Sequence, residues 1–202
     1  ELLHTPFDKE DAYHSLSMPV YNTAAYEFDT AEAMEEAFCG RTADHAYSRI
    51  TNPTVQYFEK RIQTITGALS VTALNSGMAA ISNIFFTLAQ AGANIVTSAH
   101  LFGNTYSFFK STLAAFGVEV RFCDLTNPEA VRAQVDENTC AVFLEVIPNP
   151  QLEVADLKVL SGIAHQIGAP LIADTTVVPF HIFHANEFGV DIEIVSSTKY
   201  IS

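Results

Sequence analysis

The feature that most constrains the fold is a regular alternation of short apolar runs and helix-like segments after residue 50. Four of the helix-like segments are closed by a glycine. The apolar runs are residues 71–74, 94–98, 118–123, 140–146, 170–173 and 191–195, and the helical patterns are residues 53–66, 77–90, 105–116, 128–135 and 154–167. Strands that alternate with helices predict βαβ units, and therefore an α/β fold with a mainly parallel sheet and helices on both faces.

The first 50 residues lack this alternation. Pro6 and Pro19 interrupt them, and they contain one predicted helix over residues 31–39, with Thr30 as its N-cap and Gly40 just past its end. An arm without a core of its own usually packs on another part of an assembly. We therefore expect residues 1–50 to form an arm that contacts a neighbouring subunit, and residues 51–202 to form the ligand-binding domain.

Composition narrows the classes of partner. The 202 residues are 49% hydrophobic and 16% charged, which is typical of a packed globular protein. A net charge of −13 and a pI near 4.7 argue against binding to nucleic acid or to an anionic membrane surface. An anionic ligand would need donors concentrated in a pocket.

The cysteines and the apolar runs bear on localisation. Cys39, Cys123 and Cys140 are odd in number, far apart and without a CxxC pair, which favours free thiols in a reducing compartment. The polar start of the sequence does not resemble a signal peptide, and no apolar run reaches the roughly 18 residues of a membrane span. We expect a cytoplasmic location and no membrane partner.

Polar residues follow the predicted strands. Because ligands of open α/β sheets bind at the carboxyl ends of the strands, these residues should lie along one edge of the sheet. They are Ser76-Gly77-Met78, His100-Leu101-Phe102-Gly103, Asn149 between two prolines, Asp174-Thr175-Thr176, and Ser196 with Thr198 and Lys199.

Each of these residues also has an ordinary structural explanation. Ser76 is a typical helix N-cap, Phe102 a typical core residue, and Asn149 and Asp174 are common in turns. Together, however, they supply what pyridoxal phosphate requires: a small-residue helix start for the phosphate, an aromatic ring for stacking, a carboxylate for the pyridinium nitrogen and a lysine for the aldehyde. This convergence favours the cofactor.

Two other ligand classes fit less well. His181 and His184 could ligate a metal, but no acidic or thiol partner is obviously placed, so we expect no metal site. The sequence contains neither GxGxxG nor GxxxxGK[ST], which argues against nucleotide-binding Rossmann and P-loop domains.

The same residues resemble the Cys/Met metabolism family of pyridoxal phosphate-dependent enzymes, which includes O-acetylhomoserine sulfhydrylase, cystathionine γ-synthase, cystathionine lyases and methionine γ-lyase. The similarity extends over nearly the whole chain. Its carriers are Tyr47-Ser48-Arg49-Ile50-Thr51-Asn52-Pro53-Thr54, Ser76-Gly77-Met78-Ala79-Ala80-Ile81, Leu101-Phe102-Gly103-Asn104-Thr105, Asn149-Pro150, Asp174-Thr175-Thr176 and Ser196-Ser197-Thr198-Lys199-Tyr200.

The resemblance implies the large domain of a fold-type I enzyme and assigns roles to individual residues. Lys199 would attach the cofactor covalently and later shuttle protons, and Asp174 would pair with the ring nitrogen. The remaining implied cofactor contacts are Ser76, Gly77, Met78, Phe102, Thr176, Ser196 and Thr198. Tyr47 and Arg49 would reach the phosphate of a neighbouring subunit's cofactor, Tyr47 would also act in catalysis and touch the substrate, and Asn149 would bind the ring hydroxyl or the substrate carboxylate.

The chain departs from the family pattern at three points. Phe102 stands where the family usually has tyrosine, and Val195 where it usually has histidine. Family members also continue for roughly as many residues again after the position of Ser202, with the rest of the large domain and a C-terminal domain. The resemblance therefore covers the N-terminal half, truncated before the C-terminal domain, and we hypothesise that the remainder is another chain or that this is a fragment.

The expected reaction is γ-replacement on O-acetylhomoserine with sulfide or a thiol, in methionine and cysteine biosynthesis. The alternatives are γ-elimination from methionine or cystathionine, and a non-catalytic truncated relative that binds the cofactor or only dimerises. The resemblance also implies a homotetramer, arranged as a dimer of dimers, with cofactor sites shared between subunits.

Overall fold

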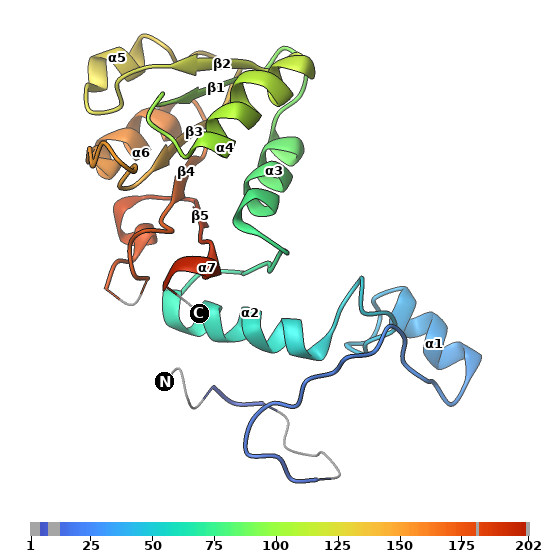
Figure 1. Cartoon of the computed structure of the whole chain (residues 1–202). Coiled ribbons are helices and arrows are strands. Elements are labelled where there is room, and N and C mark those ends of the chain that lie inside the picture. Colours follow the sequence, from blue (N-terminus) through green and yellow to red (C-terminus); the bar gives the residue numbers. More distant parts are fainter. Residues whose placement is uncertain (1–4, 8–12, 181, 201–202) are drawn as a thin grey trace. The chain divides into compact units, whose positions relative to one another are not determined.

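The computed structural model describes residues 5–7, 13–180 and 182–200, and of Tyr200 only the backbone (Figure 1). Contacts divide the chain into two compact units, Glu1–Ala73 and Leu74–Ser202, which we call unit 1 and unit 2. From the sequence, we instead divide the chain between residues 50 and 51, because residues 1–50 are expected to contact a neighbouring subunit. That role stays a prediction. None of the described helices is long and apolar enough to cross a membrane.

Unit 2 is built on a parallel five-stranded sheet. The strand order is β2-β1-β3-β4-β5, and every neighbouring pair is parallel. The strands are β1 Asn94–Thr97, β2 Glu119–Phe122, β3 Thr139–Glu145, β4 Leu171–Asp174 and β5 Ile192–Ile194. All five carboxyl ends therefore meet at one edge.

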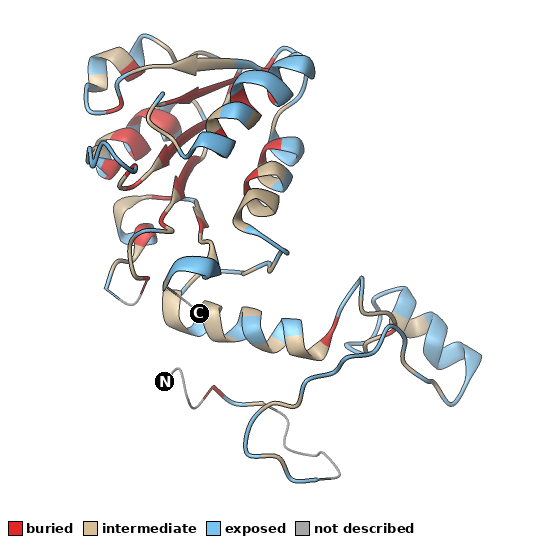
Figure 2. Cartoon of the chain, viewed as in Figure 1, coloured by how far each residue is buried: buried red, intermediate tan, exposed pale blue. Residues whose placement is uncertain are grey.

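Helices cover both faces of this sheet, because alternate strand residues enter two separate cores (Figure 2). On one face, α5 and α6 pack over Val142, Leu144 and Ala173, and on the other, α3 and a π-helix pack over Phe143 and Ile172. The helices of unit 2 are α3 Gly77–Leu88, α4 Gly103–Ser107, the π-helix η1 Phe108–Leu113, α5 Pro128–Arg132, α6 Leu157–Gln166, the 3₁₀-helix η2 Ala185–Phe188 and α7 Ser197–Tyr200.

Among its described residues, unit 1 contains two helices and little buried surface. They are α1 Ala31–Phe38, capped by Thr30, and α2 Pro53–Thr66, which begins after the N-cap Asn52 and ends at Gly67 in the left-handed conformation. Neither helix contains a buried residue. Large apolar side chains such as Leu16 and Ile50 are exposed in this unit. The described part of unit 1 is thus loosely packed.

The predicted α/β class is confirmed, and five of the six predicted strands are present. The prediction of a strand over residues 71–74 is wrong, because this segment pairs with no strand of the five-stranded sheet and Leu74 is 41% exposed. The helix predicted over residues 105–116 begins earlier, as α4, and continues as η1. The short helices η2 and α7 were not predicted, since four residues show no helical periodicity.

Candidate active site

Two carboxylates stand side by side at the carboxyl edge of the sheet. Glu145 ends β3 and Asp174 ends β4, and they are direct partners in the parallel register. Two residues upstream of each, Phe143 and Ile172 enter the same core. Because side chains of a strand alternate between faces, Glu145 and Asp174 project on that same face. The sequence singled out Asp174 but missed Glu145, although a glutamate at the end of an otherwise apolar strand was a usable signal.

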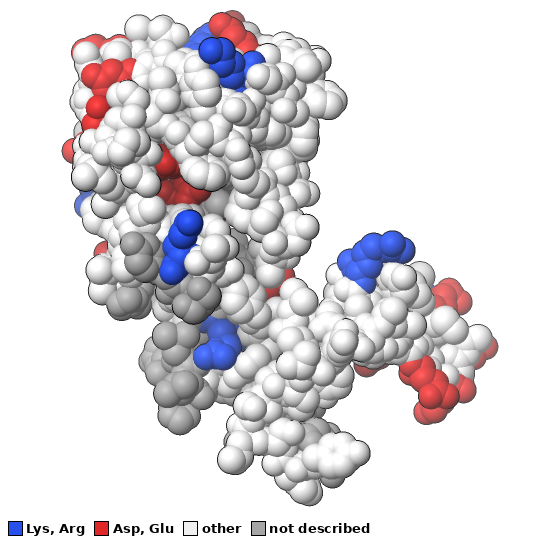
Figure 3. All heavy atoms as spheres, viewed as in Figure 1, with Lys and Arg blue, Asp and Glu red and all other residues white. Residues whose placement is uncertain are grey.

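Burial makes ionisation costly for both groups. It raises the pKa of Asp174, against hydrogen bonds from Thr176 that lower it. Burial, reinforced by the nearby Asp174 charge, raises the pKa of Glu145 to about 7, against the hydrogen bond from the Phe102 amide. On the face of unit 2 turned to the viewer in Figure 3, acidic atoms occupy a hollow, and basic atoms lie next to it. Such a carboxylate pair favours a cationic group of a ligand.

Hydrogen bonds connect Asp174 to the segment that carries the lysine. The Thr176 amide donates to Oδ1 of Asp174 at 2.9 Å, and Oγ1 of Thr176 accepts from the Ser196 amide, also at 2.9 Å. The Lys199 amide then donates to the Ser196 carbonyl within the turn that opens α7. These bonds bring together Asp174, Thr176 and Ser196, three of the predicted cofactor contacts.

The start of α3 provides a cradle for an anion. Ser76 is its N-cap, with Oγ accepting from the Ala79 amide at 3.1 Å, while its carbonyl accepts from the Ala80 amide. The amides of Gly77 and Met78 precede these and have no acceptor within the helix. A Cβ added at Gly77 would lie 2.9 Å from Cβ of Ser196. Glycine is therefore required where the helix start and the Ser196 loop touch.

Phe102 lies beside this cradle. Its amide donates to Oε1 of Glu145 at 2.6 Å, while the residue as a whole is 58% exposed. It is the N-cap position of α4, whose Thr105 hydroxyl contacts Sδ of Met78 at 3.6 Å. The ring is thus available for stacking on a ligand. The alternative prediction, that Phe102 belongs to the core, does not fit its exposure.

The remaining predicted site residues are exposed on unit 2 or belong to unit 1. Thr198 and Lys199 are exposed on α7, and Asn149 is exposed in the turn after β3. In the described part of the chain, no hydrogen bond joins the Asn149 side chain to the other predicted site residues. Tyr47 and Arg49 belong to unit 1, where the Arg49 guanidinium lies 5.1 Å from the centroid of the Tyr47 ring. They therefore form a local cation–π pair.

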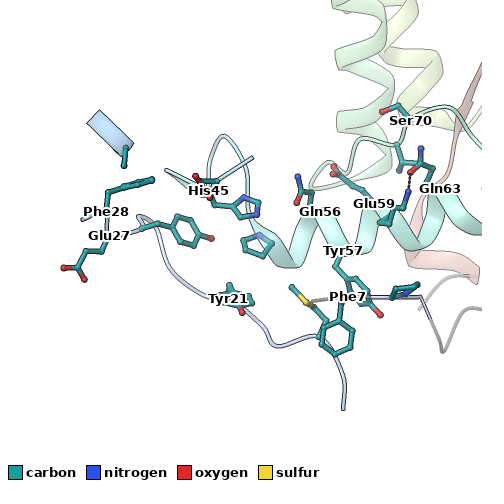
Figure 4. Close-up of a pocket in the computed structure, with 18 of the residues that line it drawn as sticks. Phe7, Tyr21, Glu27, Phe28, His45, Gln56, Tyr57, Glu59, Gln63 and Ser70 are labelled. Atoms are coloured by element: carbon teal, nitrogen blue, oxygen red, sulfur yellow. Dashed lines mark hydrogen bonds between the residues drawn. The ribbon is translucent and has the colours of Figure 1, made fainter. Parts of the chain in front are cut away.

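Unit 1 also contains an open groove of about 980 Å³ (Figure 4). Aromatic side chains of Phe7, Tyr21, Phe28 and Tyr57 line it together with acidic ones such as Glu59. None of the predicted cofactor or substrate residues lines this groove. Its size is therefore no indication of the chemistry predicted for the sheet edge.

The described residues contain no group of three or more His, Cys, Asp or Glu side chains placed to hold a metal ion. Of the two histidines considered as ligands in the sequence, His181 lies outside the described residues. The sequence-based expectation that the protein has no metal site is unchanged by this.

The donor set at the sheet edge fits pyridoxal phosphate. The two amides at the start of α3 that have no acceptor within the helix suit its phosphate. The partly buried carboxylate of Asp174, whose ionisation a cation would favour, suits its protonated ring nitrogen. An exposed aromatic ring and a lysine complete the set. A parallel α/β sheet with this edge defines the cofactor domain of a pyridoxal phosphate enzyme.

Comparison with known sequences agrees with this class. The family model for Cys/Met metabolism PLP-dependent enzymes matches residues 1–202. The chain is 38% identical over 185 residues to O-acetyl-L-homoserine sulfhydrylase of Corynebacterium glutamicum, covering 91% of this chain and 42% of that protein. It is 37% identical over 194 residues to L-methionine gamma-lyase of Fusobacterium nucleatum, covering 96% and 49%. The chain belongs to the family of Cys/Met metabolism PLP-dependent enzymes.

Solved structures show the same fold. A putative O-acetylhomoserine (thiol)-lyase of Campylobacter jejuni, which carries N′-pyridoxyl-lysine-5′-monophosphate, matches with a TM-score of 0.92 at 30% identity, over 99% of this chain and 47% of that one. O-Acetylhomoserine sulfhydrylase of Wolinella succinogenes matches with a TM-score of 0.69 at 52% identity, over 71% and 42%. The chain thus spans about half the length of these relatives. The predicted family, fold class and cofactor are confirmed.

Proposed function

We propose that the protein containing this chain catalyses γ-replacement on O-acetylhomoserine, with sulfide or a thiol as the incoming nucleophile. The products would be acetate and homocysteine or methionine. Relatives named as O-acetylhomoserine sulfhydrylase and homocysteine synthase support this choice, at 38% and 36% identity. The observation that carries it is the exposed Phe102 ring at the candidate site, which has no hydroxyl to offer.

The described residues would divide the work of holding the cofactor. The amides of Gly77 and Met78 would bind the phosphate, with hydroxyls from Ser76, Ser196, Thr176 and Thr198 around it. Asp174 would pair with the ring nitrogen and keep it protonated, and Phe102 would stack on the ring. When bound, pyridoxal phosphate stabilises negative charge at the carbon next to the amino group of its substrate.

Lys199 would hold the cofactor covalently until the substrate amine replaces it, and its amine would then be free to act as a base. It would take the proton from the α carbon of the substrate. A second deprotonation, at the β carbon, would expel acetate with its bonding electron pair, and the thiolate would form the new bond at the γ carbon. Protons returned to the β and α carbons by the Lys199 amine would then complete the replacement of acetate by the thiolate. One amine placed near the α carbon and then the β carbon can move both protons, which is general acid–base catalysis by a positioned group.

The lack of a hydroxyl on Phe102 should affect acetate and thiolate leaving groups differently. Acetate is stable as an anion and needs no proton when it leaves. A thiolate leaving from methionine or cystathionine is more basic and benefits from a proton donor. Because phenylalanine keeps the stacking surface but donates no proton, it should disfavour thiolate departure more than acetate departure. Tyr106 or a neighbour's Tyr47 could replace that donor, so we expect a preference for acetate departure and not a complete loss of thiolate departure.

Other parts of the site would come from a second subunit. Tyr47 and Arg49, which form a pair in unit 1, would reach the cofactor phosphate of a neighbour, and Asn149 would contact the substrate. The exposed apolar side chains of unit 1 support its use as a contact arm. The assembly we propose is a homotetramer, a dimer of dimers, in the cytoplasm. Native mass spectrometry that finds only single chains would contradict it.

Assays of the two reactions on the purified full-length protein test the proposed activity. We expect homocysteine formation from O-acetylhomoserine and sulfide to be faster than α-ketobutyrate release from methionine, when both are measured as kcat/KM. Faster release from methionine without added thiol would favour the γ-lyase alternative, which the 37% identical methionine gamma-lyase makes the main competitor. A protein that binds the cofactor but catalyses neither reaction would be the non-catalytic relative.

Phe102→Tyr should move the balance between the reactions. The added phenol supplies an acid for thiolate departure, and a positioned general acid contributes about 10²- to 10⁴-fold. We expect the ratio of methionine γ-elimination to γ-replacement to rise by at least about tenfold. Phe116→Tyr is the matched control, because Phe116 is also exposed, at 61%, and packs on Phe86 away from the carboxylate pair. An unchanged ratio in Phe102→Tyr would remove the argument for the acetyl substrate.

A further inference from the structure

Glu145 is a partly buried carboxylate that the proposed reaction leaves without a role. It ends β3 beside Asp174, and its Oε1 accepts the Phe102 amide at 2.6 Å. It therefore touches the segment that carries the stacking ring and neighbours the carboxylate assigned to the ring nitrogen. Among the described side chains, only that of Glu145 both accepts a hydrogen bond from the Phe102 amide and belongs to the residue paired with Asp174 in the sheet.

We propose that Glu145 is a positioning residue for the cofactor: it fixes the backbone of Phe102, and its negative charge reinforces Asp174 in holding a protonated ring nitrogen. The inference rests on the proposed function, since it presupposes that Asp174 faces that nitrogen. Neighbouring strands lie about 4.8 Å apart, and the charge of Asp174 already acts on Glu145, so a cation held by Asp174 should also feel a charge on Glu145.

The surroundings of Glu145 leave few competing charges. Apart from Asp174 on β4, the titratable groups that line the small cavity beside it are His100 and Glu153. These two satisfy each other, because Nδ1 of His100 lies 2.7 Å from Oε2 of Glu153. Both are also about two-fifths exposed, so solvent screens them more than it screens Glu145. Glu145 is thus a partly buried carboxylate paired directly with Asp174 in the strand register.

Ionisation of Glu145 then becomes coupled to cofactor binding. Because burial raises the pKa of Glu145 to about 7, the carboxyl is largely neutral at pH 5.5 and largely ionised at pH 8.5. A neutral Glu145 keeps its hydrogen bond to Phe102 but adds no charge beside Asp174. An ionised one adds that charge, and a charge at this range changes a neighbour's protonation by about one pKa unit or more, which corresponds to about tenfold in affinity.

Glu145→Gln tests this coupling, because the amide oxygen can still accept from Phe102 while the charge is lost. The affinity for pyridoxal phosphate alone is measured by visible absorbance as cofactor-free protein is titrated. We expect Glu145→Gln to bind about tenfold more weakly than the wild type at pH 8.5, and equally at pH 5.5. Glu153→Gln, a loss of one carboxylate from the same cavity, should differ from the wild type by less than about twofold at both values.

A second variant separates the two roles of Glu145. Glu145→Ala also removes the acceptor for Phe102 and should weaken binding at both pH values. If the loss in Glu145→Gln does not depend on pH, or matches that in Glu153→Gln, the charge has no role and the inference is overturned. Failure of the proposed function looks different: the wild type would then bind the cofactor without forming the visible band of a lysine-bound species, or would bind it and catalyse nothing.

Discussion

Lys199→Ala should leave the protein unable to hold pyridoxal phosphate covalently. The visible band of the lysine-bound cofactor should be absent, and borohydride should fix no cofactor to the chain. Because the variant also lacks the amine that would move the substrate protons, we expect γ-replacement to fall by at least about 100-fold, the lower end of what positioned acid–base groups contribute. The measurements are the absorption spectrum, the mass after borohydride treatment, and kcat.

Two variants control for the loss of positive charge. Lys199→Arg keeps a cation at the position but cannot lose its proton, so it should also lack the band. Lys110→Ala removes an exposed lysine whose Nζ donates to the Tyr106 hydroxyl at 3.1 Å, and it should keep the band and most activity. A band that persists in Lys199→Ala would mean that another lysine anchors the cofactor, and the assignment would be wrong.

Local signals made much of the fold predictable. Asn52-Pro53 marks the start of α2 and Gly67 its end, and both act through backbone chemistry that needs no tertiary context. Buried β-branched runs became strands because a parallel sheet covered on both faces accepts apolar residues in succession. Residues 71–74 show the limit of this reasoning. The run is apolar, yet a strand also needs a partner, and partners cannot be deduced from composition.

The candidate site was predictable where it follows topology. Asp174 ends a strand, and Thr176 and Ser196 follow strands within two residues, so the rule for parallel sheets places all three at one edge, where hydrogen bonds connect them. Glu145 was missed because it was counted within an apolar run, and only the register that pairs it with Asp174 shows its significance. The roles of Tyr47 and Arg49 at a neighbour's cofactor require an interface between subunits, so these two roles remain proposals.

Gly77→Ala should be the most damaging small substitution at the site. The backbone there is not in the left-handed region, so the reason for glycine is space: the new Cβ would lie 2.9 Å from Cβ and 3.3 Å from Oγ of Ser196. Relieving this contact must move the start of α3 away from the Ser196 loop. Overpacking of this kind costs about 1–3 kcal/mol of unfolding free energy. We also expect pyridoxal phosphate to bind at least about tenfold more weakly, because the Gly77 and Met78 amides move.

Gly162→Ala is the matched control for stability. Gly162 lies inside α6 with no atom within 4 Å of an added Cβ, so alanine there should stabilise the protein by about 0.5–1 kcal/mol. Thermal unfolding and cofactor titration of both variants give the comparison. Two glycine-to-alanine changes in helices should therefore shift the melting temperature in opposite directions. A Gly77→Ala variant as stable as Gly162→Ala would show that the helix start and the loop do not touch.

A double variant identifies the contact itself. Ser196→Gly removes the two atoms that the Gly77→Ala methyl would meet most closely, so adding it to Gly77→Ala should restore much of the lost stability. Residues in contact are expected to be non-additive by about 0.5–3 kcal/mol in such a cycle. Affinity for the cofactor should recover less than stability, because the Ser196 hydroxyl is itself an expected phosphate contact. Additive effects would instead mean that Gly77 is needed for a reason unrelated to Ser196.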